Sequence, residues 1–175
     1  MDVDVDVQGD VVYHPRVSEA IQTPEATVIS SFDELGFDPP ILRAIAEAGY
    51  TQPMPVQALC ARPILEGRDL VVRSQTGSGK TVAFAAPLLQ RVSFEGTRPQ
   101  ALVLAPTREL AIQDHSEFEK LGRYTNMRSV VIYGGTGFTL QLSRLAEGCH
   151  IVVGTPGRIL DHYRRRTLDL SDVRI

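Results

Sequence analysis

The sequence has only two cysteines, no long apolar run and little excess charge. Cys60 and Cys149 lie far apart and fit no metal-binding or redox spacing, so we expect buried free thiols in a reducing compartment. No stretch approaches the roughly 18 apolar residues that a membrane span requires. The N-terminus also lacks the basic start and apolar run of a secretory signal, so we expect a cytoplasmic protein that contacts no membrane.

The charge is unevenly distributed along the chain. The net charge is −3, but six acidic residues and one arginine fall within residues 1–31, which leaves the remainder weakly basic. So small an excess does not identify a nucleic-acid-binding protein. Residues 1–30 lack a sustained apolar period, and we expect an acidic flexible segment there. The alternation of aspartate and valine from Asp2 could instead form an edge strand.

Regular structure is predicted from Asp38 onward. Asp38 is a candidate N-cap, Pro39 suits the first helical position and Gly49 suits a helix end, so a short amphipathic helix lies between them. Short β-branched runs then alternate with helical patterns, and the runs are 70–72, 102–104, 130–132 and 151–153. This alternation predicts an α/β fold, with helices on both faces of a doubly wound, mostly parallel sheet. Ligands of such sheets bind beyond the carboxyl ends of the strands.

One segment, S-Q-T-G-S-G-K-T ending at Thr81, predicts a phosphate-binding loop. It departs from G-x-x-x-x-G-K-[ST] only where serine replaces the first glycine. Gly77 and Gly79 let the backbone curl so that its amides face one centre, and the following helix adds its positive end. We expect Lys80 to reach the β- and γ-phosphates of ATP and the Thr81 hydroxyl to bind Mg²⁺. The candidate nucleotide-binding residues of this loop are Gln75, Thr76, Gly77, Ser78, Gly79, Lys80 and Thr81.

The alternative for this segment is a glycine-rich turn with an incidental lysine. An apolar run, the loop, G-K-T and an apolar helix pattern stand in the required order, which favours nucleotide binding. The loop alone does not distinguish a kinase from an ATPase or a GTPase.

Four further motifs flank the loop. They are G-Y-T-Q-P-M-P-V-Q ending at Gln57, P-T-R-E-L-A beginning at Pro106, the pair Gly134 and Gly135, and T-P-G-R beginning at Thr155. In this order, and with Phe32 as an isolated upstream aromatic, they resemble the Q motif, motif Ia, the paired-glycine motif and motif Ib of DEAD-box RNA helicases. The resemblance covers residues 32–158. It implies the N-terminal RecA-like domain of an ATP-dependent RNA helicase, with ATP and Mg²⁺ as cofactors.

The same resemblance implies an adenine site. Gln57 would read the base with one acceptor and one donor, as glutamine reads adenine in DNA. Tyr50 would stack on the base and Phe32 would brace the pocket. From the residues alone, core packing is the alternative for both aromatic side chains.

The resemblance also implies contacts with the sugar-phosphate backbone of RNA. Hydroxyls, arginines and amides at helix N-termini can bind phosphate without reading sequence. The candidates are Pro106, Thr107, Arg108, Gly135, Thr155, Pro156, Gly157 and Arg158.

Each of these candidates also has a simpler interpretation. Thr107 and Thr155 could cap the helices that they precede, alone or in addition, and Arg108 could pair with Glu109 or with another acid on the surface. For the arginine run 164–166 we favour a solvated helix end over an RNA patch.

The family's catalytic acids, in its D-E-A-D tetrad, have no counterpart here. The last residues, 171–175, resemble the start of the strand that would carry the tetrad. None of Asp161, Asp169 and Asp172 replaces it, because none follows an apolar strand. We therefore expect residues 31–175 to be a RecA-like helicase ATP-binding domain truncated at its C-terminal side, followed by a second RecA-like domain beyond Ile175. Such a fragment would bind nucleotide and hydrolyse it negligibly, and its unpaired sheet edge could lead to self-association.

Two other functions remain open at this point. A non-catalytic module could use the ATP and RNA sites for regulation, and the residues that follow Ile175 would distinguish it from an enzyme. A small-molecule kinase would need a lid and acceptor-binding acids, and it leaves Gln57 and the downstream motifs unexplained.

Overall fold

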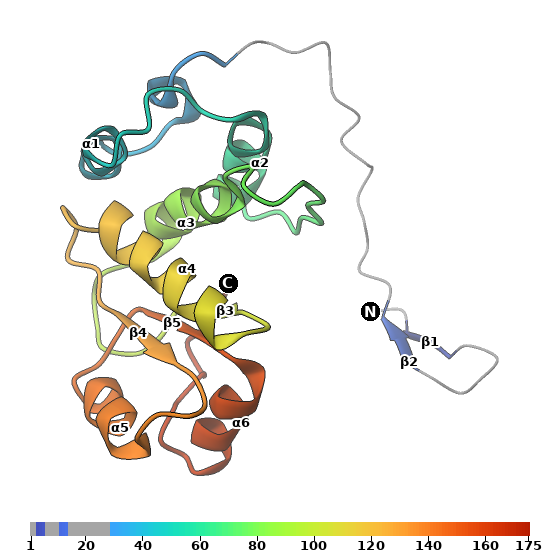
Figure 1. Ribbon diagram of the computed structural model, residues 1–175, viewed down its shortest axis with the longest axis vertical. Coiled ribbons are helices and arrows are strands. Elements are labelled where there is room, and N and C mark those ends of the chain that lie inside the picture. Colours follow the sequence, from blue (N-terminus) through green and yellow to red (C-terminus); the bar gives the residue numbers. More distant parts are fainter. Residues whose placement is uncertain (1–2, 6–10, 14–28) are drawn as a thin grey trace.

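The computed structural model describes residues 3–5, 11–13 and 29–175 (Figure 1). Within residues 29–175, three parallel strands form a sheet in the order β3, β5, β4. Their bounds are Ala101–Leu104 for β3, Ser129–Ile132 for β4 and Ile151–Gly154 for β5. A helix follows each strand along the chain. The predicted α/β fold with parallel strands is therefore confirmed, and so are the strands predicted at 102–104, 130–132 and 151–153.

Helices cover both faces of this sheet, with α3 and α4 on one side and α5 and α6 on the other (Figure 1). One cluster of buried side chains joins Phe118 of α4 to Ile151 and Val153, and a second joins Ile159 of α6 to Val152. Because β5 is covered on both faces, its sequence is an unbroken apolar run. The helical elements are η1 (Phe32–Leu35, a 3₁₀ helix), α1 (Pro39–Glu47), α2 (Pro55–Leu65), α3 (Lys80–Arg91), α4 (Arg108–Leu121), α5 (Phe138–Ala146) and α6 (Pro156–Arg164).

The predicted first helix is confirmed as α1. Asp38 precedes it in an extended conformation, Pro39 opens it, and Ile41 and Ile45 are buried on one face. Gly49, just beyond the end, has a φ of 84°, a backbone conformation in which glycine avoids the cost that a Cβ would add.

The strand predicted at 70–72 is absent, and that prediction is wrong. Val71 and Val72 are 74% and 42% exposed. A strand needs a neighbouring backbone for its hydrogen bonds, and no strand of the described residues lies beside this segment. The outer edge of β3 is instead extended by the last residues of the chain. The Leu102 amide donates to the Ile175 carbonyl (2.9 Å), and the Arg174 amide donates to the Gln100 carbonyl (2.9 Å).

The aspartate-valine alternation near the N-terminus forms a strand where it is described. β1 (Val3–Val5) pairs antiparallel with β2 (Val11–Tyr13). β1 agrees with the strand alternative. Most of the flexible segment predicted for residues 1–30, namely 1–2, 6–10 and 14–28, lies outside the described residues.

Both cysteines are buried free thiols, as predicted. Burial raises the pKa of Cys149 to about 11, so this thiol is protonated at neutral pH. The described residues contain no group of three or more metal-ligating side chains. In this part of the chain, none of the helices is long and apolar enough to cross a membrane.

Helix α6 ends on a left-handed residue that is not glycine. Arg166 has a φ of 57°. Its amide donates to the Tyr163 carbonyl (2.9 Å) and the Thr167 amide donates to the His162 carbonyl (3.0 Å). These two bonds form a Schellman motif, in which glycine is the preferred residue at this position.

Replacing Arg166 by glycine is expected to raise the free energy of unfolding by roughly 1 kcal/mol, because it removes the steric cost of a Cβ in the left-handed region. Urea unfolding followed by circular dichroism measures the change. The matched control is Arg164→Gly, inside the same helix, which should lower the free energy of unfolding by about 1 kcal/mol. An Arg166→Gly chain less stable than the unaltered one would contradict this account of the helix end.

Candidate functional site

The predicted phosphate loop leads directly into α3. Gly77 and Gly79 have φ values of 77° and 82°, and Gly79 is the N-cap residue of the helix. Both glycines therefore adopt the left-handed conformation that the loop requires. Amides of the first turn of α3 have no partner within the helix, which makes this end of α3 suited to an anion.

Lys80 lies across the loop. Its Nζ donates to the Ser74 carbonyl (2.8 Å) and to the Gln75 carbonyl. Ser74, which stands where the phosphate-loop pattern has glycine, forms a 2.7 Å hydrogen bond between its hydroxyl and that of Ser78. Ser74 therefore links the start of the loop to Ser78 near its end. The carbonyl groups of the loop bind the Lys80 ammonium group, and phosphate oxygens of a nucleotide could take the place of these carbonyls.

Gln57, at the start of α2, contacts the phosphate loop. Its side chain is 3% exposed, its Oε1 accepts from the Met54 amide (2.9 Å) and its Nε2 donates to the Gly79 carbonyl (3.3 Å). A Cβ on Gly79 would lie 2.5 Å from Nε2, so glycine is needed for this approach. A primary amide has two donor hydrogens and an oxygen with two lone pairs, so these two bonds leave one donor hydrogen and one lone pair of Gln57 unused.

The two predicted aromatic residues have different surroundings. Phe32 is buried in the core cluster, in agreement with the packing alternative. Tyr50 is only partly buried, and its hydroxyl donates to Glu117 Oε1 of α4 (2.7 Å). Burial, reinforced by Glu117, raises the pKa of the Tyr50 phenol.

Sequence reasoning missed Asp114 of α4. The Thr81 hydroxyl donates to Asp114 Oδ1 (3.1 Å), and both residues line a pocket of about 340 Å³ together with Lys80. Burial raises the pKa of Asp114, and the hydrogen bond from Thr81 opposes that shift. The spacing along α4 could have indicated Asp114. It lies one helical turn before the core residue Phe118, so the two side chains share one face of the helix.

The other predicted motifs gather at the carboxyl ends of β3, β4 and β5. Because these strands are parallel neighbours, the segments after them meet at one edge of the sheet. Thr107 caps α4 by accepting from the Leu110 amide (3.3 Å), which confirms its capping alternative. Thr155 is the N-cap residue of α6 but makes no side-chain cap bond. Its hydroxyl is therefore available to a ligand.

Among residues 29–175, Arg108 forms no ion pair with Glu109 or with any other acid, so the ion-pair alternative is wrong there. Its guanidinium carbon instead lies 5.1 Å from the centre of the Tyr133 ring. The ring belongs to the segment that leads to Gly135, so Arg108 faces the paired-glycine loop.

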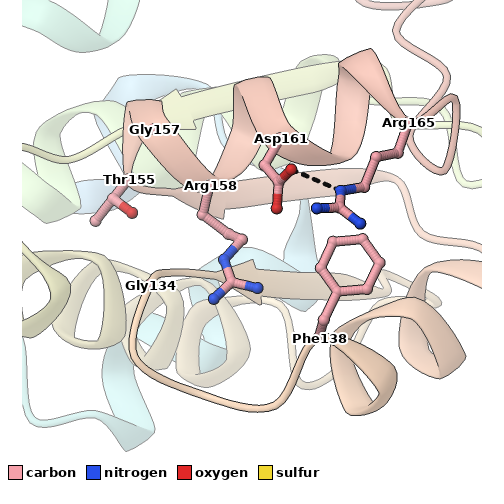
Figure 2. Close-up of a pocket in the computed structure, with 7 residues that line it drawn as sticks. All are labelled: Gly134, Phe138, Thr155, Gly157, Arg158, Asp161 and Arg165. Carbon is pink, nitrogen blue, oxygen red and sulfur yellow. Dashed lines mark hydrogen bonds and ion pairs between the residues drawn. The ribbon is translucent and has the colours of Figure 1, made fainter.

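A pocket of about 670 Å³ opens between the paired-glycine loop and α6 (Figure 2). Arg158 Nη2 donates to the Thr136 carbonyl (3.3 Å), which directs this side chain toward the loop. Arg158 and Arg165 approach the ring of Phe138, with guanidinium carbons 5.7 Å and 4.9 Å from its centre. The residues that line the pocket are Gly134, Phe138, Thr155, Gly157, Arg158, Asp161 and Arg165.

The arginine run lies at the end of α6. Arg164, Arg165 and Arg166 are all exposed, as expected of a solvated helix end. Arg165 also lines the pocket, where its Nε donates to Asp161 Oδ1 (2.7 Å). The pocket therefore contains two arginines and one acid, and its net charge suits an anion.

A buried network supports the pocket from behind. His162, which received no role from the sequence, is fully buried and stacks on Phe138 with ring centres 4.2 Å apart. Its Nε2 contacts Gln141 Oε1 (3.2 Å), and Gln141 Nε2 donates to the Tyr133 carbonyl (2.9 Å). Burial, and then the nearby Arg158 charge, lowers the pKa of His162, so this imidazole is neutral at pH 7.

Comparison with known proteins identifies the family. The model of the DEAD/DEAH box helicase family matches residues 54–175. The ATP-dependent RNA helicase DeaD of Klebsiella pneumoniae is 51% identical over 145 residues, which cover 81% of this chain and 22% of that protein. The chain thus spans about a quarter of the length of the curated relatives that it matches.

Two solved structures share the fold. A DEAD box protein from Methanococcus jannaschii is 41% identical, with a TM-score of 0.78 over 83% of this chain and 40% of that one. Dbp5 of S. cerevisiae, bound to RNA and ADP BeF3, is 33% identical, with a TM-score of 0.74 over 83% of this chain and 37% of that one. The chain therefore belongs to the DEAD/DEAH box helicase family, and its fold is part of a RecA-like α/β domain.

Proposed function

We propose that this chain is the nucleotide-binding and RNA-backbone-binding part of an ATP-dependent RNA helicase. The observation that carries the proposal is the contact between Gln57 and Gly79, because it sets an amide suited to adenine against the phosphate loop. Related chains support it, since DeaD is an ATP-dependent RNA helicase and Dbp5 was solved with RNA and ADP BeF3.

On the nucleotide side, Lys80 exchanges its bonds to loop carbonyls for bonds to phosphate oxygens. Gln57 presents its remaining donor and acceptor to the adenine edge, and Tyr50 offers its ring face to the base. The oxygen atoms of Thr81 and Asp114, beside the loop, are the kind of ligand that Mg²⁺ prefers, so these residues fit the ion. When bound with ATP, Mg²⁺ would neutralise part of the phosphate charge.

On the RNA side, Arg158 and the free hydroxyl of Thr155 hold phosphate groups in the pocket beside Gly157. Arg108 and the amides that begin α4 extend this surface along the edge of the sheet. Such contacts position the RNA and read no base, so binding is independent of sequence.

Hydrolysis of ATP by these residues alone is expected to be negligible. The segments directly after β3, β4 and β5, which are 105–107, 133–137 and 155, contain no carboxylate to orient an attacking water. Binding and hydrolysis can therefore be measured separately in this chain.

Replacing Arg158 by alanine is expected to lower the affinity for single-stranded RNA about tenfold and to leave ADP affinity unchanged, because one phosphate contact is lost. Fluorescence anisotropy of a labelled oligonucleotide measures the first quantity, at several salt concentrations. The salt dependence should also weaken, by about one counterion.

Arg164→Ala is the matched control, because Arg164 lies on the same helix and is exposed outside the pocket. It removes the same charge and should change RNA affinity much less. Equal losses in the two variants would show that general charge, and not this pocket, binds RNA.

A further inference from the structure

Asp114 is the acidic side chain that lines the pocket beside Lys80 and Thr81. Its Oδ1 accepts from the Thr81 hydroxyl at 3.1 Å, one residue beyond Lys80. It comes from α4, a helix that the nucleotide motifs do not include. An inference about Asp114 rests on the proposed function, because it concerns the same nucleotide site.

The packing of two helices holds Asp114 in this place. Phe84 of α3 and Phe118 of α4 pack with ring centres 6.0 Å apart, and Phe118 is fully buried. Phe84 lies one turn after Thr81, and Phe118 lies one turn after Asp114. The aromatic contact therefore sets the carboxylate of one helix against the hydroxyl of the other.

Asp114 does not serve as the ion-pair partner of Lys80. Lys80 Nζ is bound to the carbonyls of Ser74 and Gln75, and no ion pair joins it to Asp114 among residues 29–175. The other side chains around Asp114 are mostly apolar, and they include Cys60, Ile64 and Leu110. The hydroxyl of Thr81 is its hydrogen-bonding partner there.

The hydrogen bond from Thr81 to Asp114 affects how the Thr81 hydroxyl can bind a cation. A threonine hydroxyl has one proton and two lone pairs. When the proton is donated to Asp114, the lone pairs of Thr81 remain for a cation. Without that acceptor, no partner fixes the rotation of the hydroxyl, and its lone pairs have no set direction.

We propose that Asp114 is a positioning residue, which orients the Thr81 hydroxyl toward a divalent cation bound with the nucleotide and adds a negative charge beside that cation. The sign of its effect depends on the metal. Without a divalent cation, a carboxylate near the phosphates repels them; with one, it favours the complex. Asp114 therefore increases the gain in nucleotide affinity that Mg²⁺ produces.

Equilibrium titration of the chain with mant-ADP, a fluorescent adenine nucleotide, tests this in MgCl₂ and in EDTA. Asp114→Val should reduce the ratio of the two affinities about tenfold, with the loss confined to the measurement in MgCl₂. Asp114→Asn, which keeps an acceptor oxygen, should reduce the ratio only about threefold. In a Thr81→Val chain, adding Asp114→Val should reduce the ratio by less than it does in the unaltered chain, because the hydroxyl to be oriented is gone and only the effect of the carboxylate charge remains.

Glu119→Gln is the matched control, since Glu119 is an exposed carboxylate of α4 outside the pocket, and its ratio should equal that of the unaltered chain. Thermal unfolding checks that each variant is folded. If Asp114→Val is not, Asp114→Asn decides, and an unaltered ratio in that variant overturns the inference. Equal losses of affinity in MgCl₂ and EDTA would overturn it too, since they indicate general damage. No mant-ADP binding by the unaltered chain would overturn the proposed function as well.

Discussion

Replacing Lys80 by alanine is expected to lower the affinity of the chain for ATP about a hundredfold, the largest effect on binding of any single change considered. Its ammonium group lies inside the phosphate loop, held by the Ser74 and Gln75 carbonyls. Two charge-assisted hydrogen bonds to phosphate oxygens would replace these contacts, each contributing about 1.5–3 kcal/mol before the loss of the loop contacts is subtracted. Titration with mant-ATP measures the change.

The matched control for Lys80→Ala is Arg91→Ala, at the opposite end of α3. It removes one positive charge from the same helix, far along the chain from the loop, and should leave ATP affinity within about twofold of the original. A folded Lys80→Ala chain with undiminished ATP affinity would contradict the phosphate-binding role of the loop.

Replacing Gly154 by alanine is expected to lower the free energy of unfolding by about 3 kcal/mol or more. Gly154 ends the central strand β5. A Cβ there would overlap the Ile132 carbonyl oxygen of β4 and would lie 2.9 Å from Ile159 Cδ1 of α6. Backbone cannot rotate away as a flexible side chain can, so β4 or α6 must shift. Urea unfolding measures the loss.

Gly137→Ala is the matched control for this substitution. A Cβ on Gly137 would meet no atom within 4 Å, and its φ of −58° suits any residue. Its effect on the free energy of unfolding should stay below about 1 kcal/mol. If Gly154→Ala unfolds at the same urea concentration as the unaltered chain, the close approach of β4, β5 and α6 is incorrect.

The Gly154 substitution also connects the fold to the RNA pocket. Thr155, the N-cap residue of α6, follows Gly154 directly, and Arg158 lies in the first turn of that helix. A displaced α6 would move both residues away from the paired-glycine loop. Gly154→Ala should therefore weaken RNA binding even in solutions where the chain remains folded.

Features with local causes could be predicted from the sequence. The glycines of the phosphate loop adopt positive φ because only glycine does so without strain, and the motif can be recognised from neighbouring residues alone. The three confirmed strands were predictable because burial on both faces demands continuous apolar runs. Because the strands are parallel, the motifs that follow them lie at the same edge of the sheet.

Features that depend on distant partners could not be predicted in this way. The run 70–72 has the composition of a strand, yet strand formation also requires a neighbouring strand, which one sequence does not reveal. Asp114 lies on α4 and Arg165 directly follows α6, and the rotation of each helix about its axis decides which neighbours these side chains meet. Sequence spacing predicts the helices, whereas the Phe84–Phe118 and Phe138–His162 contacts fix their rotation.

The most direct test of the central claim is a comparison of mant-ADP and mant-GDP binding to the unaltered chain, by equilibrium fluorescence titration. Saturable binding with at least about tenfold preference for the adenine nucleotide is expected, because Gln57 can match the adenine edge with a donor and an acceptor. Equal affinity for the two nucleotides, or no saturable binding of either, would contradict it.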